Sequence, residues 1–243
     1  MNTYRFFWIA SHKYIVEAVE SSLSVKHYNP YSDFTLFTTK GTILSTNVEN
    51  RFNRVIYLEN VHSKYWFLSS VNYMLSALSY FDDGEKIVYL DTDTHVCASL
   101  NGIFEALDRF DFVGAHAPGR STAKTVGYIP DSFPEYNIGV QGIVNSESMR
   151  RFFGNWLQIY EENQDTYGNN DQAPLREAIW NYSRKDLVFG TLPTEYNFRF
   201  GMGGQVREMV RVLHGRSDNF RNLSERVNSG YRSIRSWSQG ELK

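Results

Sequence analysis

The chain has 243 residues, of which 42% are apolar and 16% aromatic, and its formal net charge is −2. This length and composition suit one large packed domain and exclude an intrinsically disordered chain. The near-neutral charge gives no reason to expect binding to nucleic acid or to an anionic membrane surface.

The first half of the chain alternates between strand and helix patterns. Apolar runs predict strands over residues 3–11, 34–39, 53–60 and 86–90. Helical spacing predicts a helix over 13–25, with its apolar face formed by Ile15, Val16, Val19 and Leu23, and a second helix over 64–81.

The second half is less regular. Ser99 is expected to cap a short helix that carries Leu100, Ile103, Phe104 and Leu107. A strand over 110–116, an irregular segment over 117–137, a strand over 139–146 and a helix over 146–160 follow. A last helix is expected to begin at Asp171, as its cap, and to run to 180. The tail from 205 to 243 has eight basic and four acidic residues and no strong periodicity beyond 214.

This alternation predicts an α/β fold with a mostly parallel central sheet and helices on both faces. In such sheets, ligands bind beyond the C-terminal ends of the strands. Asp91 and Asp93 lie at such an end, directly after the strand over 86–90.

Asp91 and Asp93 are separated by one residue, so both carboxylates can face the same side of the strand end. Two such charges repel each other unless a cation neutralises them, and carboxylate oxygens suit Mg²⁺ or Mn²⁺. A bound cation could in turn hold a diphosphate. His214 could complete the site, and His95 is its local rival. An ordinary polar loop is the alternative interpretation.

Two further groups of polar residues are candidates for a binding site. Asn137 lies just before the strand predicted over 139–146 and Gly139 at its start, and Asp171 and Gln172 stand at a helix start. An amide can donate and accept hydrogen bonds, and a glycine lets the backbone approach a ligand. Taken alone, the first pair can be a turn and Asp171 can be a helix cap.

The order of these features resembles a known family. A strand followed by Asp-x-Asp, Asn-x-Gly-Val, Asp-Gln, "LPTEYNFRF" and His-Gly is similar to GT-A fold glycosyltransferases of the glycogenin and lipopolysaccharide galactosyltransferase type. The resemblance covers residues 4–216. It implies a Rossmann-like nucleotide-binding half and an acceptor-side half in a domain over 1–216. Residues 217–243 lie outside the resemblance, and we expect them to form a basic tail or a helical cover of the same domain.

The resemblance also implies roles for individual residues. Asp91, Asp93 and His214 would hold Mn²⁺, or Mg²⁺, on the diphosphate of a nucleotide sugar, with UDP as the expected nucleotide. Asp171 and Gln172 would be the catalytic pair, and Tyr196 and Asn197 would lie beside the acceptor. The expected donor-binding set is Ala10, Tyr14, Lys64, Asp91, Thr92, Asp93, Asn137, Gly139, Gly215 and Arg216.

The expected function is therefore metal-dependent transfer of a sugar from a nucleotide diphosphate donor to a glycan, lipid or protein acceptor. The resemblance implies retention of configuration, with Asp171 or Gln172 stabilising positive charge on the sugar. Inversion would instead require a general base, for which Asp171 is the candidate. A second possible function is that of a nucleotidyltransferase, but such enzymes usually have a glycine-rich loop near the first strand, and this sequence has none there. A third possible function is that of a non-catalytic module that binds nucleotide sugars.

The single cysteine, Cys97, cannot form an internal disulfide. The apolar run near the N-terminus, Phe6 to Ala10, is too short for a signal peptide or a membrane span. We therefore expect a cytoplasmic protein without a transmembrane segment. The sequence leaves the oligomeric state open.

Overall fold

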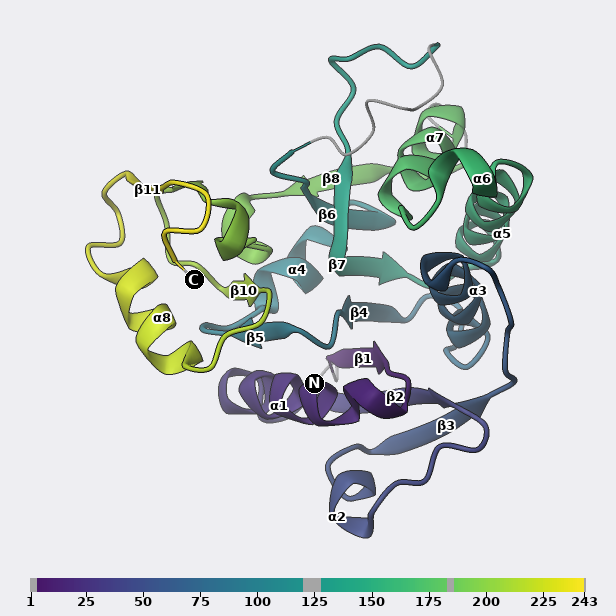
Figure 1. Ribbon diagram of the computed structural model, residues 1–243, viewed down its shortest axis with the longest axis horizontal. Helices are drawn as coiled ribbons and strands as arrows, with labels where there is room; N and C mark the ends of the chain where they lie inside the picture. Colours follow the sequence, from purple (N-terminus) through teal and green to yellow (C-terminus); the bar gives the residue numbers. More distant parts are fainter. Residues whose placement is uncertain (1–3, 120–127, 183–185, 243) are drawn as a thin grey trace.

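A computed structural model describes residues 4–119, 128–182 and 186–242, and a seven-stranded sheet forms its centre (Figure 1). The strand order is β3-β2-β1-β4-β7-β6-β8. The strands are β1 (Arg5–Ile9), β2 (Asp33–Thr39), β3 (Arg54–Leu58), β4 (Lys86–Leu90), β6 (Phe112–His116), β7 (Tyr136–Val144) and β8 (Phe189–Leu192). Only β7 runs antiparallel to its neighbours, β4 and β6. The prediction of a mostly parallel sheet is confirmed.

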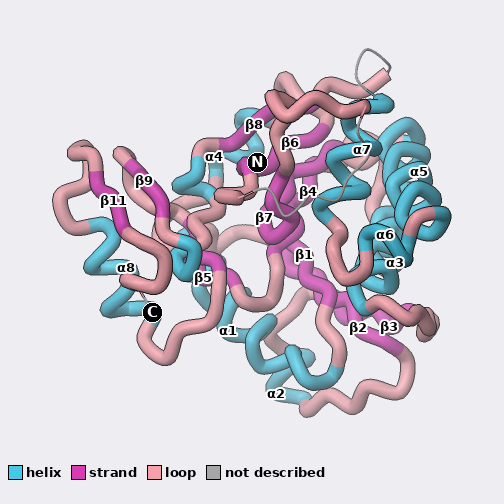
Figure 2. The backbone as a smooth tube through the Cα atoms, turned by 45° about the horizontal axis from the view of Figure 1, so that its top comes forward, coloured by secondary structure: helices cyan, strands magenta, loops and turns pink. Residues whose placement is uncertain are grey.

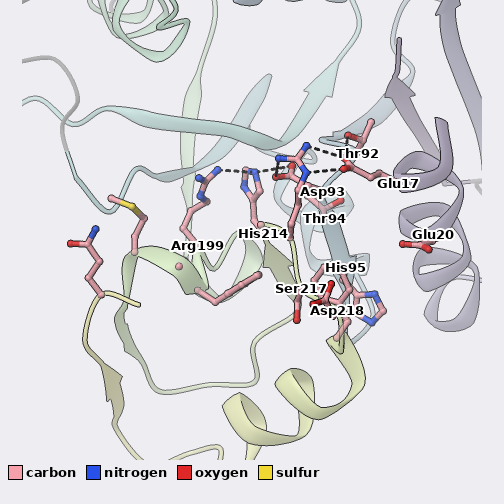
Figure 3. Close-up of a pocket in the computed structure, with 17 residues that line it drawn as sticks. Glu17, Glu20, Thr92, Asp93, Thr94, His95, Arg199, His214, Ser217 and Asp218 are labelled. Atoms are coloured by element: carbon pink, nitrogen blue, oxygen red, sulfur yellow. Dashed lines mark hydrogen bonds and ion pairs between the residues drawn. The ribbon is translucent and has the colours of Figure 1, made fainter. Parts of the chain in front are cut away.

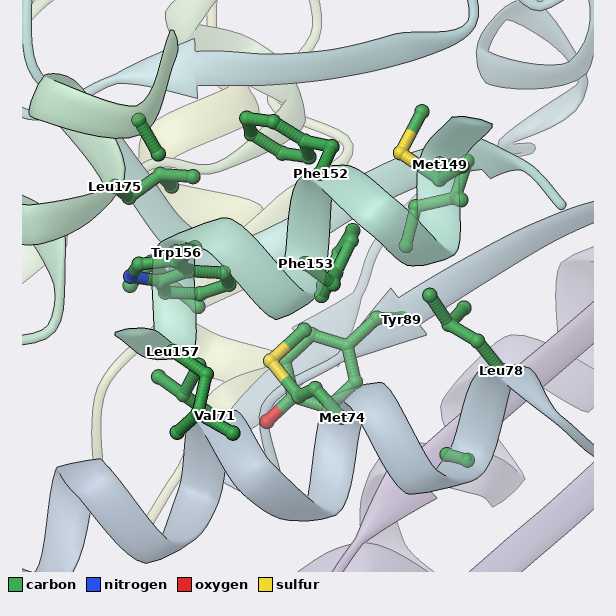
Figure 4. Close-up of a cluster of buried hydrophobic side chains, with 14 of the residues drawn as sticks. Val71, Met74, Leu78, Tyr89, Met149, Phe152, Phe153, Trp156, Leu157 and Leu175 are labelled. Carbon is green, nitrogen blue, oxygen red and sulfur yellow. The ribbon is translucent and has the colours of Figure 1, made fainter. Parts of the chain in front are cut away.

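Helices cover both faces of the sheet, as predicted. The described helices are α1 (Ile15–Tyr28), α2 (Thr46–Glu49), α3 (Trp66–Leu78), α4 (Asn101–Ala106), α5 (Glu147–Glu162), α6 (Gln164–Tyr167), α7 (Gln172–Tyr182) and α8 (Phe220–Asn228). On one face, the side chains of α3, α5 and α7 pack around Tyr89 and its neighbours on the sheet (Figure 4). On the other face, α1 and α4 cover Phe6, Trp8 and Val88.

The inward face of α1 differs from the one predicted. Val16 and Leu23 were expected to be buried, but they are 67% and 44% exposed. Ser21 is buried instead, where its hydroxyl accepts a hydrogen bond from Trp8 Nε1 and lies 2.8 Å from the hydroxyl of Thr94. Because these partners satisfy the hydroxyl, a polar residue can occupy a core-facing position that an apolar pattern cannot reveal.

The C-terminal part of the chain packs beside the sheet rather than extending it (Figures 1 and 2). Here β5 (Thr94–Val96) pairs with β10 (Val212–His214), and β9 (Gly204–Val206) pairs with β11 (Arg235–Trp237). A third apolar cluster joins Phe198 and Phe200 to Leu223 and Val227 of α8. The division of the chain at residue 216 stays a prediction.

The predicted irregular segment over 117–137 lies partly outside the described residues. Its last described stretch, 128–135, forms turns, and the strand that follows begins at Tyr136, three residues earlier than predicted. In the part of the chain that the structure describes, no helix is both long enough and apolar enough to cross a membrane.

Candidate active site

The end of β4 and the beginning of β7 form the floor of the candidate site. Because the two strands are antiparallel, with Leu90 opposite Val140, the carboxyl end of β4 meets the amino end of β7. The Asp91 amide donates to the Gly139 carbonyl over 2.9 Å. The alternative interpretation, in which Asn137 and Gly139 form a turn before a strand, is wrong, because β7 begins at Tyr136, which lies opposite His116 of β6.

A second pairing brings His214 to the aspartates. In the ladder between β5 and β10, Thr94 lies opposite His214, and the Gly215 amide donates to the Asp93 carbonyl over 2.9 Å. His214 Nε2 lies 3.4 Å from Asp91 Oδ2 and 3.4 Å from Asp93 Oδ1. In Figure 3, the side chains of Arg199, His214 and Asp93 form a row. The structure thus unites the three residues that the resemblance implied as metal ligands.

The three residues fit a divalent cation. Their ligand atoms all lie within 4.8 Å of one another. Two adjacent ligands of an octahedral ion, each about 2.1 Å from it, are about 3 Å apart, close to the separations from His214 Nε2. Carboxylate oxygens with one imidazole suit Mn²⁺ or Mg²⁺. The ring of His95 stacks on Phe220 instead, with 4.7 Å between centroids.

The charges of the site favour a cation between these groups. Burial would raise the pKa of Asp93, but the hydrogen bond to His214 and the positive charges of His214, Arg216 and Arg199 lower it to about 2. Burial would lower the pKa of His214, but its contacts with Asp91 and Asp93 raise it. Positive charge close to Asp93 is therefore favourable in this site.

Asp91 and Asp93 face a cavity of about 520 Å³. It is lined by much of the predicted set, namely Tyr14, Asp91, Thr92, Asp93, Asn137, Gly139, Asp171, Gln172, His214 and Arg216. A second cavity, of about 690 Å³, shares Asp93, His214 and Arg216 with the first and also includes Gly215. The candidate metal site thus lies where two cavities meet.

Asp171 and Gln172 lie at the start of α7, across the first cavity from β4. The prediction that Asp171 caps this helix is wrong, because Asn170 Oδ1 accepts from the amides of Gln172 and Ala173. Burial and the nearby charge of Asp91 raise the pKa of Asp171 to about 8. Gln172 accepts a hydrogen bond from Asn137 and donates one to Glu135.

Some predicted residues are not brought to the cavities. Both backbone groups of Ala10 are bonded within the protein, its amide to Phe37 and its carbonyl to Thr38. Lys64 pairs with Asp165 over 2.8 Å and lines a separate cavity.

The two residues expected beside the acceptor, Tyr196 and Asn197, do not line either of these two cavities. Tyr196 lines another cavity, under the guanidinium of Arg211. Asn197 is buried beneath the site, where its Oδ1 lies 2.8 Å from His214 Nδ1.

The sequence interpretation missed three polar residues of the site. Arg199 Nη1 lies 2.9 Å from His214 Nε2, Tyr89 donates to Asp91 Oδ1 over 2.6 Å, and Glu17 accepts two hydrogen bonds from Arg216. Tyr89 stands two positions before Asp91, and this spacing on a strand could have revealed it. No local pattern marks Arg199 or Glu17.

No family model and no curated protein matches the sequence. Solved structures do match in fold. Glycosyltransferase GlyE of Streptococcus pneumoniae TIGR4 is 17% identical with a TM-score of 0.59, covering 82% of this chain and 48% of its own. The chain therefore spans about half the length of GlyE.

Two glycosyltransferase structures match over more of their own length. Galactosyltransferase LgtC, solved with donor and acceptor sugar analogues, is 17% identical with a TM-score of 0.61, covering 81% of this chain and 76% of its own. Mouse xyloside xylosyltransferase 1 is 13% identical with a TM-score of 0.56, and the match covers 99% of this chain and 96% of the mouse chain. The resemblance inferred from the sequence is thus confirmed in fold: the chain has the GT-A type α/β fold of these glycosyltransferases.

Proposed function

We propose that this protein is a metal-dependent glycosyltransferase, which moves a sugar from a nucleoside diphosphate donor to an acceptor. The observation that carries the proposal is the cluster of Asp91, Asp93 and His214 at the meeting point of two cavities in a GT-A type fold. UDP is the expected nucleotide, from the family resemblance. Location in the cytoplasm stays a prediction.

The residues around the cluster suit a donor with two phosphates. A bound Mn²⁺ or Mg²⁺ would neutralise charge that develops on the departing diphosphate. Arg216 lies 3.7 Å from Asp93 and over the ring of Tyr14, at 5.3 Å from its centroid, so it can reach a phosphate held at the cluster. The ring of Tyr14, which also lines the cavity, offers a surface for a nucleobase.

The sugar would then lie toward Asp171 and Gln172. Gln172 is the only glutamine among the described residues that line this cavity. An active-site glutamine-to-glutamate variant of LgtC is one of the similar structures, at 15% identity and a TM-score of 0.62. We therefore assign Gln172 to the reacting end of the sugar, and we propose transfer with retention, as the resemblance implies.

The test is incubation with a panel of nucleotide sugars, with and without Mn²⁺, while release of the nucleoside diphosphate is measured. We expect Mn²⁺-dependent release from one donor, and proton NMR of the product should show a retained anomeric configuration. Pyrophosphate release from a nucleoside triphosphate and a sugar phosphate would instead identify a nucleotidyltransferase. Binding of a donor without any turnover would identify a binding module.

A further inference from the structure

A continuous chain of hydrogen bonds runs beneath the site from the candidate metal ligand His214 to the buried Glu135. His214 Nδ1 lies 2.8 Å from Asn197 Oδ1, and Asn197 Nδ2 donates to Asn137 Oδ1 over 2.8 Å. Asn137 Nδ2 donates to Gln172 Oε1 over 2.9 Å, and Gln172 Nε2 donates to Glu135 Oε1 over 3.0 Å. We call these five residues the amide relay.

We propose that Asn197 and Asn137 are positioning residues, which couple the orientation of the metal-site histidine to that of the Gln172 amide. This inference rests on the proposed function, because it assigns the relay to a metal site at one end and to a donor-sugar site at the other.

The orientation of each side-chain amide in the relay follows from one contact with a group that can only donate. The backbone amide of Gly139 donates to Asn137 Oδ1 over 3.1 Å, which identifies that atom as the oxygen. Asn197 must therefore present its NH₂ group to Asn137 and its oxygen to His214. Since an amide oxygen only accepts, His214 Nδ1 carries the proton of this hydrogen bond.

The other edge of the imidazole faces the candidate metal site. His214 Nε2 lies 3.4 Å from both Asp91 and Asp93 and 2.9 Å from Arg199 Nη1. In the neutral imidazole with its proton on Nδ1, Nε2 is the nitrogen whose lone pair a metal ion would take. A histidine that binds a metal through one nitrogen is commonly held by a hydrogen bond at the other.

At the far end, the relay fixes the rotation of the Gln172 amide. Its oxygen faces the NH₂ group of Asn137, and its NH₂ group faces Glu135. A rotation of the amide by 180° would place donor against donor at Asn137 and acceptor against acceptor at Glu135. Asn197 and Glu135 are each 2% exposed and Asn137 is 7% exposed. In such a buried network, a mismatch at one link is costly and is passed to the next.

Asparagine-to-aspartate variants can break the relay at single links, because an aspartate carboxylate accepts but cannot donate. Asn197→Asp keeps an acceptor for His214 Nδ1 but loses the donor to Asn137. Asn137→Asp keeps its acceptor for Gly139 and Asn197 but loses the donor to Gln172. Asn197→Leu breaks the links on both sides. Asn145→Asp is the matched control, because Asn145 is fully buried and donates to the Phe81 carbonyl outside the relay.

Mn²⁺ affinity, measured by electron paramagnetic resonance titration, and turnover of the donor are the two readouts. For Asn197→Asp and Asn137→Asp we expect Mn²⁺ affinity to be kept and turnover to fall by about tenfold or more. For Asn197→Leu we expect Mn²⁺ affinity to fall by about tenfold or more as well. Asn145→Asp should change neither quantity in the folded protein.

A direct measurement of the tautomer does not depend on any variant. With ¹⁵N-labelled histidine and diamagnetic Mg²⁺ bound, long-range proton–nitrogen correlation spectra should show the His214 proton on Nδ1. A proton on Nε2 would overturn the proposal. Unchanged Mn²⁺ affinity in folded Asn197→Leu, or turnover that falls equally in Asn145→Asp, would also overturn it.

The failure of this proposal can be told apart from failure of the proposed function. If no nucleotide sugar is turned over, the tautomer and the Mn²⁺ affinities still test the relay at its metal end. If the wild-type protein transfers a sugar while Asn197→Leu binds Mn²⁺ normally, the relay is excluded and the glycosyltransferase assignment stands.

Discussion

The imidazole of His214 packs so closely on Gly139 that a Cβ atom added to residue 139 would lie 2.0 Å from His214 Cε1. The position of His214 therefore requires a glycine on the neighbouring strand, for reasons of space and not of backbone conformation. This contact explains why Gly139 belongs to the site although it offers no side chain.

We predict that Gly139→Ala moves the His214 ring and weakens Mn²⁺ binding by about tenfold or more, as expected when the orientation of a ligand is lost. The control is Gly154→Ala in α5, where an added Cβ meets nothing within 4 Å. That change should leave Mn²⁺ binding intact and stabilise the helix by about 1 kcal/mol. Normal Mn²⁺ affinity in folded Gly139→Ala would contradict the assigned position of His214.

Arg199 Nη1 lies 2.9 Å from His214 Nε2, the nitrogen at which the cation is expected to bind. A metal ion must displace this guanidinium and is repelled by it, so removal of the charge should favour the metal. We predict that Arg199→Gln binds Mn²⁺ about three- to tenfold more tightly in the absence of nucleotide, a gain of about 1 kcal/mol. Isothermal titration calorimetry measures this change. Weaker Mn²⁺ binding in Arg199→Gln would show that Arg199 supports the metal site instead.

Arg216 is held by Glu17 through contacts of 2.7 and 3.0 Å, in a position from which it can reach a diphosphate. We predict that Arg216→Gln weakens binding of a nucleoside diphosphate with Mn²⁺ by about tenfold, the loss of one charge-assisted contact. Glu17→Gln releases the same arginine and should leave binding equal or tighter. If both variants weaken binding equally, the ion pair itself is what the nucleotide requires.

Asp171 should make the stability of the metal-free protein depend on pH. Its pKa is raised from 3.8 to about 8 in the folded protein. At pH values between these two, the folded state therefore binds more protons than the unfolded state. The free energy of unfolding therefore falls as pH rises through this window.

Asp171→Asn should remove this pH dependence. The Tm of the variant should exceed that of the wild type at pH 8.5 by at least about 2–4 °C, the shift that 1 kcal/mol produces in a chain of this size. The advantage should shrink toward pH 4. Asp83→Asn, an exposed carboxylate paired with Arg150, is the control. A difference between Asp171→Asn and wild type that does not vary with pH would contradict the raised pKa.

Much of the fold could be predicted from the sequence, because β4 contains a continuous apolar run and α3 repeats apolar residues at helical spacing. The buried face of α1 could not, since Ser21 depends on partners from two other elements. Asp91 and Asp93 were identifiable because their position at the end of a strand is a local feature.

The rest of the site depends on contacts between distant segments. His214 reaches Asp93 only through the pairing of β5 with β10, and no local pattern encodes that pairing. Arg199 reaches the same histidine because Phe198 forms a bridge with Leu213. Lys64 was predicted to contact the donor, but it forms an ion pair with Asp165 instead, and its sequence neighbours do not reveal that distant partner.

The proposed function requires that Asp91, Asp93 and His214 hold a metal ion on the diphosphate of a nucleotide sugar. Thermal melting of the wild type and of Asp93→Ala, with a panel of nucleotide sugars and with or without Mn²⁺, tests it most directly. A donor at 100 times its Kd stabilises the folded protein by about 2.7 kcal/mol. We predict that one donor raises the Tm of the wild type only when Mn²⁺ is present, and that Asp93→Ala shows no such rise. The absence of a shift with every nucleotide sugar, or a shift that persists without Mn²⁺ and in Asp93→Ala, would contradict the claim.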